Sequence, residues 1–354
     1  MRAMQLGIFI LFGAISAAPA GESPAVPVRT LGRVFTKLKA GQPMTIAYFG
    51  GSITAASGYR VQVTKWFRDH FPKAEVREVN AAIGGTGSDL GAFRCGVDVV
   101  AHDPDLVFVE FNINDGSPVD DFHKATMEGI VRQLWASRSK PELVFLYTTS
   151  RTLNERRGSH PAVARHYGIP QIDLQPPLLE ALKRSDLPRP TQAQLKDKNM
   201  DWNQRGQVFM SDSVHPNELG HAIYTQAIVT HLTSQIGAPP SPPPSLPAPL
   251  VSAEIATTRL VPPAEATLAG DWEVKPPVNQ GRYRHGTINA RRPGDALEYA
   301  FTGTAVALFL DAQRDGGKFS WSIDASEDKH DADPSRGGGP VGRPVRPRTD
   351  GRVR

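Results

Sequence analysis

Five short apolar segments alternate with helix-like segments along residues 44–235, and this order restricts the possible folds more than any other feature of the sequence. We expect strands at residues 45–49, 76–81, 106–111, 143–147 and 170–174. Apolar residues between them recur at helical spacing, and the last helix is expected at 218–234. Because strands that are apolar throughout and separated by helices form parallel sheets covered on both faces, the sequence predicts an α/β domain with a five-stranded parallel sheet.

The composition changes sharply after residue 237. Residues 238–250, APPSPPPSLPAPL, predict a semi-rigid polyproline linker that follows an α/β domain at 21–237. Beyond it, short alternating segments such as DALEYAF and KFSWSIDA predict a small β-sandwich-like domain at 251–326. The pattern stops abruptly, so this domain is expected to be incomplete. Residues 327–354 predict a disordered tail, which resembles a shifted reading frame or a truncated gene.

The N-terminal residues 1–20 have the organisation of a secretory signal peptide. Arg2 precedes an apolar core, and Ala18-Pro19-Ala20 forms a small-residue cleavage site. The apolar run is too short to cross a bilayer of ~30 Å, so stable membrane insertion is not expected. These features predict a secreted or periplasmic protein. The single cysteine, Cys95, excludes an internal disulfide and is interpreted as a packed core residue.

The positive charge of the chain is concentrated at its C-terminal end. Residues 336–354 hold six Arg and one Asp, whereas the whole chain has a formal net charge of +4. The rest of the chain is therefore close to neutral. Since it has neither a distributed basic face nor a nucleic-acid-binding motif, no nucleic-acid partner is expected. Oligomeric state cannot be inferred from these features.

Several expected strand ends and loops carry residues suited to acyl transfer. Ser52 follows Gly50-Gly51 at the end of the first strand, and Asp212 lies three residues before His215. The carboxylate can hold one imidazole nitrogen while the other nitrogen faces the serine, which is how a serine hydroxyl is activated. Taken alone, Ser52 is better explained as a helix N-cap than as a nucleophile.

Donors for a developing oxyanion are expected near the same serine. Gly84 and Gly85 follow the second strand and offer backbone N–H groups, and Asn114 follows the third strand and offers a side-chain amide. In a parallel sheet these strand ends share one edge, where open α/β folds bind ligands. By themselves, the two glycines are also consistent with an ordinary turn.

Four motifs in order resemble the SGNH hydrolases of the GDSL esterase superfamily, over residues 42–236. They are Gly50-Gly51-Ser52, residues 80–85, Asn112-Ile113-Asn114-Asp115, and Asp212-Ser213-Val214-His215-Pro216. The resemblance implies a three-layer α/β/α flavodoxin-like fold. It also implies Ser52 as nucleophile, His215 as base and Asp212 as its partner. The N–H groups of Ser52 and Gly85 and the Asn114 amide would form the oxyanion hole.

Two positions depart from the family pattern. Gly51 stands where the family name implies Asp, and Asn112 stands where Gly is usual. Neither is a triad or oxyanion residue, so altered support of the site is expected rather than loss of activity. No histidine has a metal-ligand spacing such as H-E-x-x-H, so no metal or other cofactor is expected. Asp89, Asp115, Asp173, His102 and His166 are interpreted as structural.

The expected substrate is an acylated carbohydrate or another small ester. Residues 189–207 form a polar segment in which Trp202 suits contact with a sugar, and Gly84 is a second candidate for substrate binding. Together with secretion and an accessory β-domain, this favours removal of acetyl groups from a polysaccharide, by analogy only. A general short-chain esterase or lysophospholipase-type lipase remains an alternative. A carbohydrate-binding protein on a degenerate hydrolase scaffold is the non-enzymatic alternative.

Overall fold

A computed structural model describes residues 26–154, 157–184, 186–187, 196, 206–262, 265–278, 284–301, 319–322 and 330–332. Several predictions therefore fall wholly or partly outside the described residues: the signal peptide, the polar segment 189–207 with Trp202, parts of the β-rich domain at 251–326 and most of the tail. Within the described part, no helix has the length and apolar character needed to cross a membrane.

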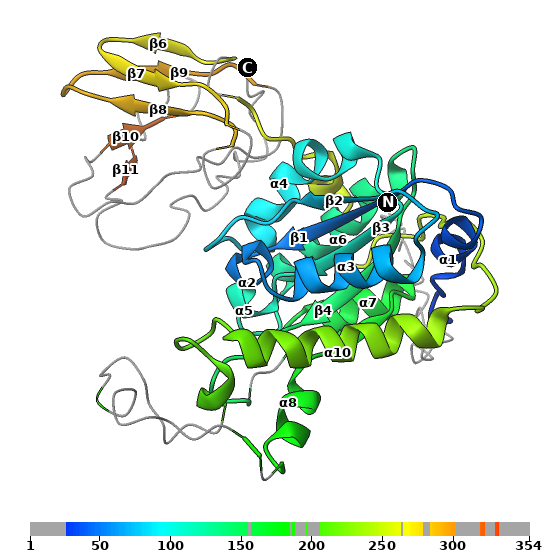
Figure 1. Ribbon diagram of the computed structural model, residues 1–354. Helices are drawn as coiled ribbons and strands as arrows, with labels where there is room; N and C mark the ends of the chain where they lie inside the picture. Colours follow the sequence, from blue (N-terminus) through cyan, green and yellow to red (C-terminus); the bar gives the residue numbers. More distant parts are fainter. Residues whose placement is uncertain are drawn as a thin grey trace, which may run out of the picture.

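The α/β part of the chain is built on one parallel sheet of five strands (Figure 1). Its spatial order is β2-β1-β3-β4-β5. The strands are β1 Met44–Gly50, β2 Val76–Asn80, β3 Leu106–Glu110, β4 Glu142–Tyr147 and β5 Gln171–Asp173. All five predicted strands are confirmed, and the continuous apolar runs of β1, β3 and β4 suit the centre of a sheet that is buried on both faces.

Helices cover both faces of the sheet and form the outer layers. They are α1 Gly32–Lys39, α2 Ser52–Ala55, α3 Tyr59–His70, α4 Ser88–Asp98, α5 Asn112–Asp115, α6 Asp121–Ala136, α7 His160–Tyr167, α8 Gln175–Ala181 and α10 Glu218–Gln235, with short 3₁₀ helices η1 Val100–His102, η2 Gln207–Phe209 and η3 Glu254–Thr257. The Asn217 side chain caps α10 by accepting the N–H of Gly220 at 3.0 Å, which fixes the start of the predicted last helix.

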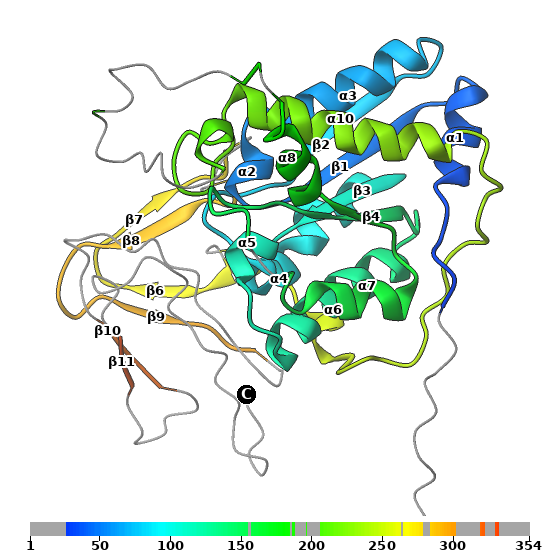
Figure 2. The ribbon, with the colours of Figure 1, turned by 90° about the horizontal axis from the view of Figure 1, so that it is seen from below.

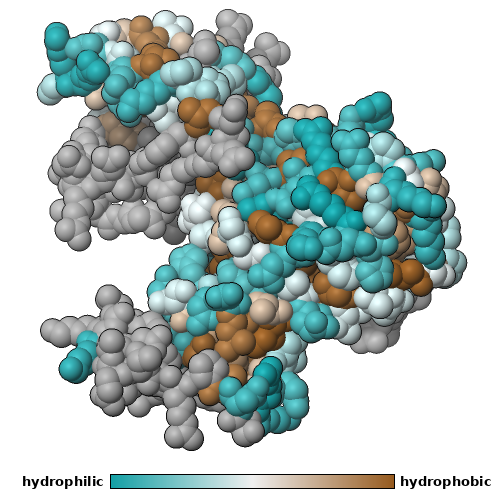
Figure 3. All heavy atoms as spheres, viewed as in Figure 1, coloured by the Kyte–Doolittle hydropathy of each residue, from teal (hydrophilic) through white to brown (hydrophobic). Residues whose placement is uncertain are grey.

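The alternation of side chains along β1 divides the core into two halves. Ile46 and Tyr48 pack with residues of α1, α3 and α10, whereas Ala47 and Phe49 pack with residues of α4, α6 and α7. Cys95 of α4 is buried in the second half, as its interpretation as a core residue predicts. The view in Figure 3 shows hydrophilic side chains spread over α3, and hydrophobic ones gathered beside α8. The three-layer α/β/α architecture is thus confirmed.

The proline-rich segment after α10 packs along the α/β domain. Thr30 donates its hydroxyl to the carbonyl of Pro239 at 2.6 Å, and Arg132 of α6 donates to the carbonyl of Pro247 at 2.9 Å. The C-terminal end of this segment contacts Glu128, a fully buried residue of α6. Its carboxylate accepts the backbone N–H groups of residues 250–252, with Val251 at 2.8 Å. The composition of the segment predicts its stiffness, but the sequence did not indicate this docking.

Beyond this segment the described residues form three antiparallel strand pairs. The strands are β6 Thr267–Ala269 with β9 Ala296–Glu298, β7 Trp272–Lys275 with β8 Thr287–Ala290, and β10 Phe319–Trp321 with β11 His330–Ala332. The first two pairs lie beside the edge of the parallel sheet at which α2 and α4 begin (Figures 1 and 2). The predicted β-rich region is therefore present. Strand β11 falls within the predicted tail, where a three-residue strand leaves no alternating pattern to detect.

Candidate active site

The chain turns sharply where β1 ends, and this turn places Ser52 at the start of α2. A Cβ atom on Gly50 would lie 2.5 Å from the carbonyl oxygen of Glu110 in the neighbouring strand, so only glycine fits this close approach. The N–H of Gly51 donates to the same carbonyl at 3.3 Å. The predicted strand end at Ser52 is thus fixed by backbone contact between β1 and β3.

Ser52, His215 and Asp212 form a hydrogen-bonded chain. The Oγ atom of Ser52 lies 2.7 Å from Nε2 of His215, and Nδ1 of His215 lies 2.7 Å from Oδ2 of Asp212. The three residues come from the end of β1 and from the loop before α10. Side chains of His215 and Asp212 remain 40% and 48% exposed, so the site is open to solvent.

The loop before α10 holds Asp212 through its own backbone. Oδ1 of Asp212 accepts the N–H groups of Val214 and His215, both at 2.9 Å. Partial burial alone would raise the pKa of the Asp212 carboxyl, but these donors and the His215 ring hold its pKa below the usual value. The charged carboxylate therefore persists beside the imidazole and fixes which ring nitrogen faces Ser52.

The predicted oxyanion residues lie around the same serine. A Cβ atom on Gly84 would lie 3.4 Å from Cβ of Ser52, and Gly85 adopts a left-handed φ of +75°. Asn114 of α5 is exposed, and its Oδ1 atom lies against Gly51. The structure thus brings the glycine loop and the Asn114 amide to Ser52. Trp202 lies outside the described residues.

The glycine at position 51 is explained by this packing. A Cβ atom there would lie 2.2 Å from Oδ1 of Asn114 and 3.4 Å from the carbonyl oxygen of Thr86. Gly51 has φ of −90°, which any residue adopts, so the constraint is space rather than backbone conformation. A side chain at this position would displace the Asn114 amide.

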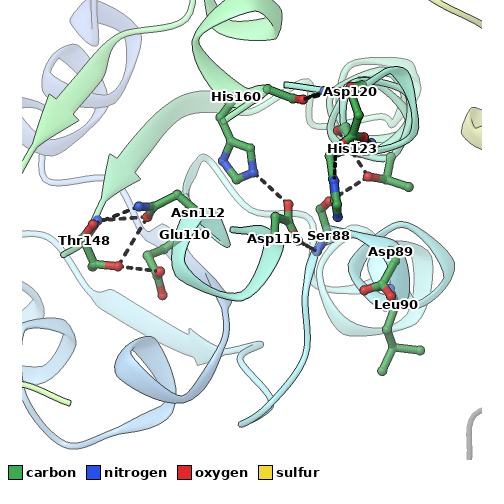
Figure 4. A network of polar contacts seen from close by, with 12 residues as sticks. Ser88, Asp89, Leu90, Glu110, Asn112, Asp115, Asp120, His123, Thr148 and His160 are labelled. Atoms are coloured by element: carbon green, nitrogen blue, oxygen red, sulfur yellow. Dashed lines mark hydrogen bonds and ion pairs between the residues drawn. The ribbon is translucent and has the colours of Figure 1, made fainter. Parts of the chain in front are cut away.

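Asn112, the other departure from the family pattern, joins two strand ends. Its Nδ2 donates to the carbonyl of Thr148 at 2.8 Å, and its Oδ1 accepts the N–H of Thr148 at 2.9 Å (Figure 4). Asn112 is buried, and this paired amide ties α5 to the residue that follows β4. Asn in place of the usual Gly therefore adds a side chain that ties α5, the helix of Asn114, to Thr148.

Asp115, interpreted from the sequence as structural, forms a buried pair beside Asn114 with a histidine that sequence reasoning missed. Oδ2 of Asp115 lies 2.7 Å from Nε2 of His160, and Oδ1 of Asp115 accepts the N–H of Ser88 at 2.8 Å (Figure 4). Burial alone would raise the pKa of Asp115, but His160 and Ser88 hold it below its usual value. Asp115 thereby links the Asn114 helix to the start of α4, just after the glycine loop. The large sequence separation of His160 left no motif to identify it.

Glu110 is a second buried group that the sequence did not single out. Its carboxyl accepts the hydroxyl groups of Thr54 and Thr148, both at 2.8 Å. Burial raises the pKa of the Glu110 carboxyl to about 7, although both hydroxyl groups favour its charged form. The residue therefore ties α2, which begins with Ser52, to the end of β4.

Comparison with known proteins gives relatives of the same architecture. The sequence model of the GDSL-like Lipase/Acylhydrolase family matches residues 48–223. No curated protein matches the sequence. Among solved structures, a two-domain esterase active on acetylated mannans is 22% identical with a TM-score of 0.74, over 93% of this chain and 90% of that chain.

Two further solved structures complete the comparison. The two-domain esterase co-crystallised with mannopentaose is 22% identical with a TM-score of 0.73, over 93% of this chain and 89% of that chain. An acetylxylan esterase from Geobacillus stearothermophilus is 21% identical with a TM-score of 0.39, over 53% of this chain and 94% of that chain. The two-domain esterase therefore shares its fold with nearly the whole chain.

Proposed function

We propose that Ser52, His215 and Asp212 hydrolyse esters through an acyl-enzyme. The chain belongs to the SGNH superfamily of GDSL-type hydrolases, and this membership is the starting point of the proposal. The observation that carries this proposal is the continuous hydrogen-bonded chain from Ser52 to Asp212, with 2.7 Å at each step. Geometry of this kind is the signature of an activated serine, whatever the order of the three residues along the chain.

Each step of the proposed reaction uses a group that the site contains. Nε2 of His215 takes the proton of Ser52 as Oγ attacks the acyl carbonyl carbon, and the carbonyl π electrons move to its oxygen. The N–H groups of Ser52 and Gly85 and the Asn114 amide stabilise this oxyanion. The oxyanion then collapses and the bond to the leaving alcohol breaks; His215 gives this alcohol its proton, and the acyl group remains on Ser52. Water, deprotonated by His215, attacks the acyl carbonyl carbon, the bond from this carbon to Oγ breaks, and His215 returns the proton to Oγ as the acid is released.

The proposed substrate is an acetylated carbohydrate. An open site with a half-exposed His215 suits an ester carried on a polymer. Glycine residues 84 and 85 offer little apolar surface, so a long acyl chain would gain little of the ~0.8 kcal/mol that each buried CH₂ contributes. The activity of the two-domain esterase on acetylated mannans points to the same substrate class. Secretion, proposed from residues 1–20, would bring the enzyme to such a polymer.

A series of nitrophenyl esters, measured beside acetate release from acetylated mannan and xylan, tests the proposal. We expect acetyl esters to be hydrolysed fastest, butyryl esters more slowly and octanoyl esters hardly at all. Acetate should be released from at least one of the acetylated polymers, and Ser52→Ala protein serves as the blank. Rates that rise with acyl length, with no acetate from either polymer, would contradict the acetyl-carbohydrate proposal and favour a lipase.

Replacing Gly51 by Ala should lower kcat for nitrophenyl acetate by about 10- to 100-fold, since an ångström-scale shift of a catalytic group has this effect. The Cβ atom of the new alanine would lie 2.2 Å from Oδ1 of Asn114 and would displace the Asn114 amide. Gly96→Ala is the matched control, because a Cβ atom there has no neighbour within 4 Å. Steady-state kinetics and melting temperatures of both variants give the answer. Wild-type kcat in Gly51→Ala would show that Asn114 does not depend on this glycine.

A further inference from the structure

One arginine of the β-rich region reaches the loop that leads to the glycine donors. Nη1 of Arg284 donates to the carbonyl oxygen of Asn80 at 3.2 Å, and Nη2 donates to the carbonyl oxygen of Ala82 at 2.8 Å. The arginine side chain is only 13% exposed. Arg284 and its two acceptors are separated by more than 200 residues, so this contact crosses from the β-rich region to the α/β domain.

The same contact continues into the α/β domain through a buried carboxylate. Asp98, at the end of α4, is 3% exposed, and its Oδ1 lies 3.7 Å from Nη1 of Arg284 and 3.0 Å from Nε2 of His285. Its Oδ2 accepts Nη1 of Arg94 at 2.8 Å. One carboxylate thus joins Arg284 and His285 of the β-rich region to an arginine buried in the α/β domain.

Arg94 carries the contact to the end of β1. It donates to the carbonyl of Ala81 and, at 3.1 Å through Nη2, to the carbonyl of Gly50. The carbonyl of Gly50 also accepts the N–H of Ile83 at 3.0 Å. The two arginines therefore hold carbonyl groups at the ends of β1 and β2, immediately before Ser52 and the Gly84–Gly85 loop.

We propose that Arg284 is a positioning residue for the oxyanion hole, through which the β-rich region fixes the loop that carries Gly84 and Gly85. This inference rests on the proposed ester hydrolysis at Ser52. Holding the carbonyls of residues 80 and 82 fixes the 80–81 and 82–83 peptide planes, which end one residue before Gly84. The N–H of Gly85 is then aimed before the oxyanion forms, which is the condition under which such donors accelerate a reaction.

A guanidinium is suited to this task because its planar fork donates in two fixed directions at once. A lysine ammonium would keep the charge near Asp98 but lacks that fixed fork. Comparing arginine with lysine at position 284 therefore distinguishes positioning of the loop from simple compensation of the Asp98 charge. Arg292 offers a matched control within the same region, because its ion pair is with Asp271 at 3.1 Å and its side chain is 74% exposed.

The test compares full-length Arg284→Ala, Arg284→Lys and Arg292→Ala with the wild type on nitrophenyl acetate, a substrate too small to need a sugar-binding surface. We expect kcat to fall about tenfold in Arg284→Ala, with KM changed less than twofold, and an intermediate fall in Arg284→Lys. Arg292→Ala should keep wild-type kcat. Equal losses in the two alanine variants, or a change in KM alone, would overturn the proposal.

Hydrogen–deuterium exchange of the backbone provides a readout that is independent of turnover. We expect faster exchange across residues 83–87 in Arg284→Ala, and wild-type exchange there in Arg292→Ala. If the wild type hydrolyses no ester, the proposed function fails, and exchange still shows whether Arg284 holds the loop. If the wild type is active while Arg284→Ala keeps wild-type kcat and exchange, the positioning role fails and the proposed function stands.

Discussion

Replacing Ser52 by Ala is expected to lower kcat for nitrophenyl acetate by about 10⁴-fold or more, while the fold is retained. The substitution removes the Oγ atom that lies 2.7 Å from Nε2 of His215, and so the nucleophile itself. It leaves the close contact between Gly50 and Glu110 intact, because that contact is made by the backbone. Stability should therefore change little, which thermal melting would verify.

A second serine, between α2 and α3, supplies the control for this substitution. Ser57 is exposed and lies five residues further along the chain, so Ser57→Ala should keep wild-type turnover. His215→Ala should lose nearly as much activity as Ser52→Ala, and the double variant should be scarcely worse than either, because the residues act as a unit. Substantial turnover in Ser52→Ala would assign the chemistry to another group.

Replacing Asn114 by Ala is expected to lower kcat by about 10²- to 10³-fold, the usual loss for one oxyanion donor. The amide lies against Gly51 next to the nucleophile, and it is exposed, so its removal should hardly affect folding. KM should change little, because the donor acts on charge that develops in the transition state. The measurement is steady-state kinetics on nitrophenyl acetate, with thermal melting beside it.

Two further variants make the result specific to the amide donor. Asn114→Asp keeps the side-chain shape but replaces the donor with a carboxylate, so it should be at least as damaging as Asn114→Ala. Ser117→Ala changes another exposed residue just beyond α5 and should keep wild-type kcat. Should Asn114→Ala lose less than twofold in kcat, the oxyanion would have to be held by backbone N–H groups alone.

The parallel sheet could be predicted from sequence because its central strands β1, β3 and β4 are buried on both faces. Strand β3, for example, has five buried residues in succession, which is typical of a central strand in a parallel sheet. The pairing of the β-rich region could not be predicted in the same way. Strand β9 lies in the alternating segment DALEYAF, but its three residues are exposed, so no buried face fixes its register or its partner strand.

Some residues of the candidate site could likewise be predicted from the sequence, and others could not. Ser52, Asn114 and His215 follow strands or precede a helix within short motifs, so the sequence indicates them directly. Asn112 belongs to such a motif, but its bond to Thr148 depends on how β3 and β4 lie side by side. His160 and Arg284 are brought to the site by tertiary folding alone. Neither residue belongs to a recognisable sequence motif, so the contacts that each makes in the fold could not be predicted.

The docked proline-rich segment also bears on where the hydrolase domain ends. Composition places that end at residue 237, but buried contacts continue beyond it: Glu128 takes donors from residues 250–252, and Thr258 donates its hydroxyl to the carbonyl of Ala92 at 3.1 Å. A Cβ atom on Gly129 would lie 2.3 Å from the Ile255 side chain, so α6 is shaped to receive η3. The packing contacts of the α/β domain therefore extend to Thr258, and a chain cut at residue 237 would leave the buried Glu128 carboxylate without three of its donors.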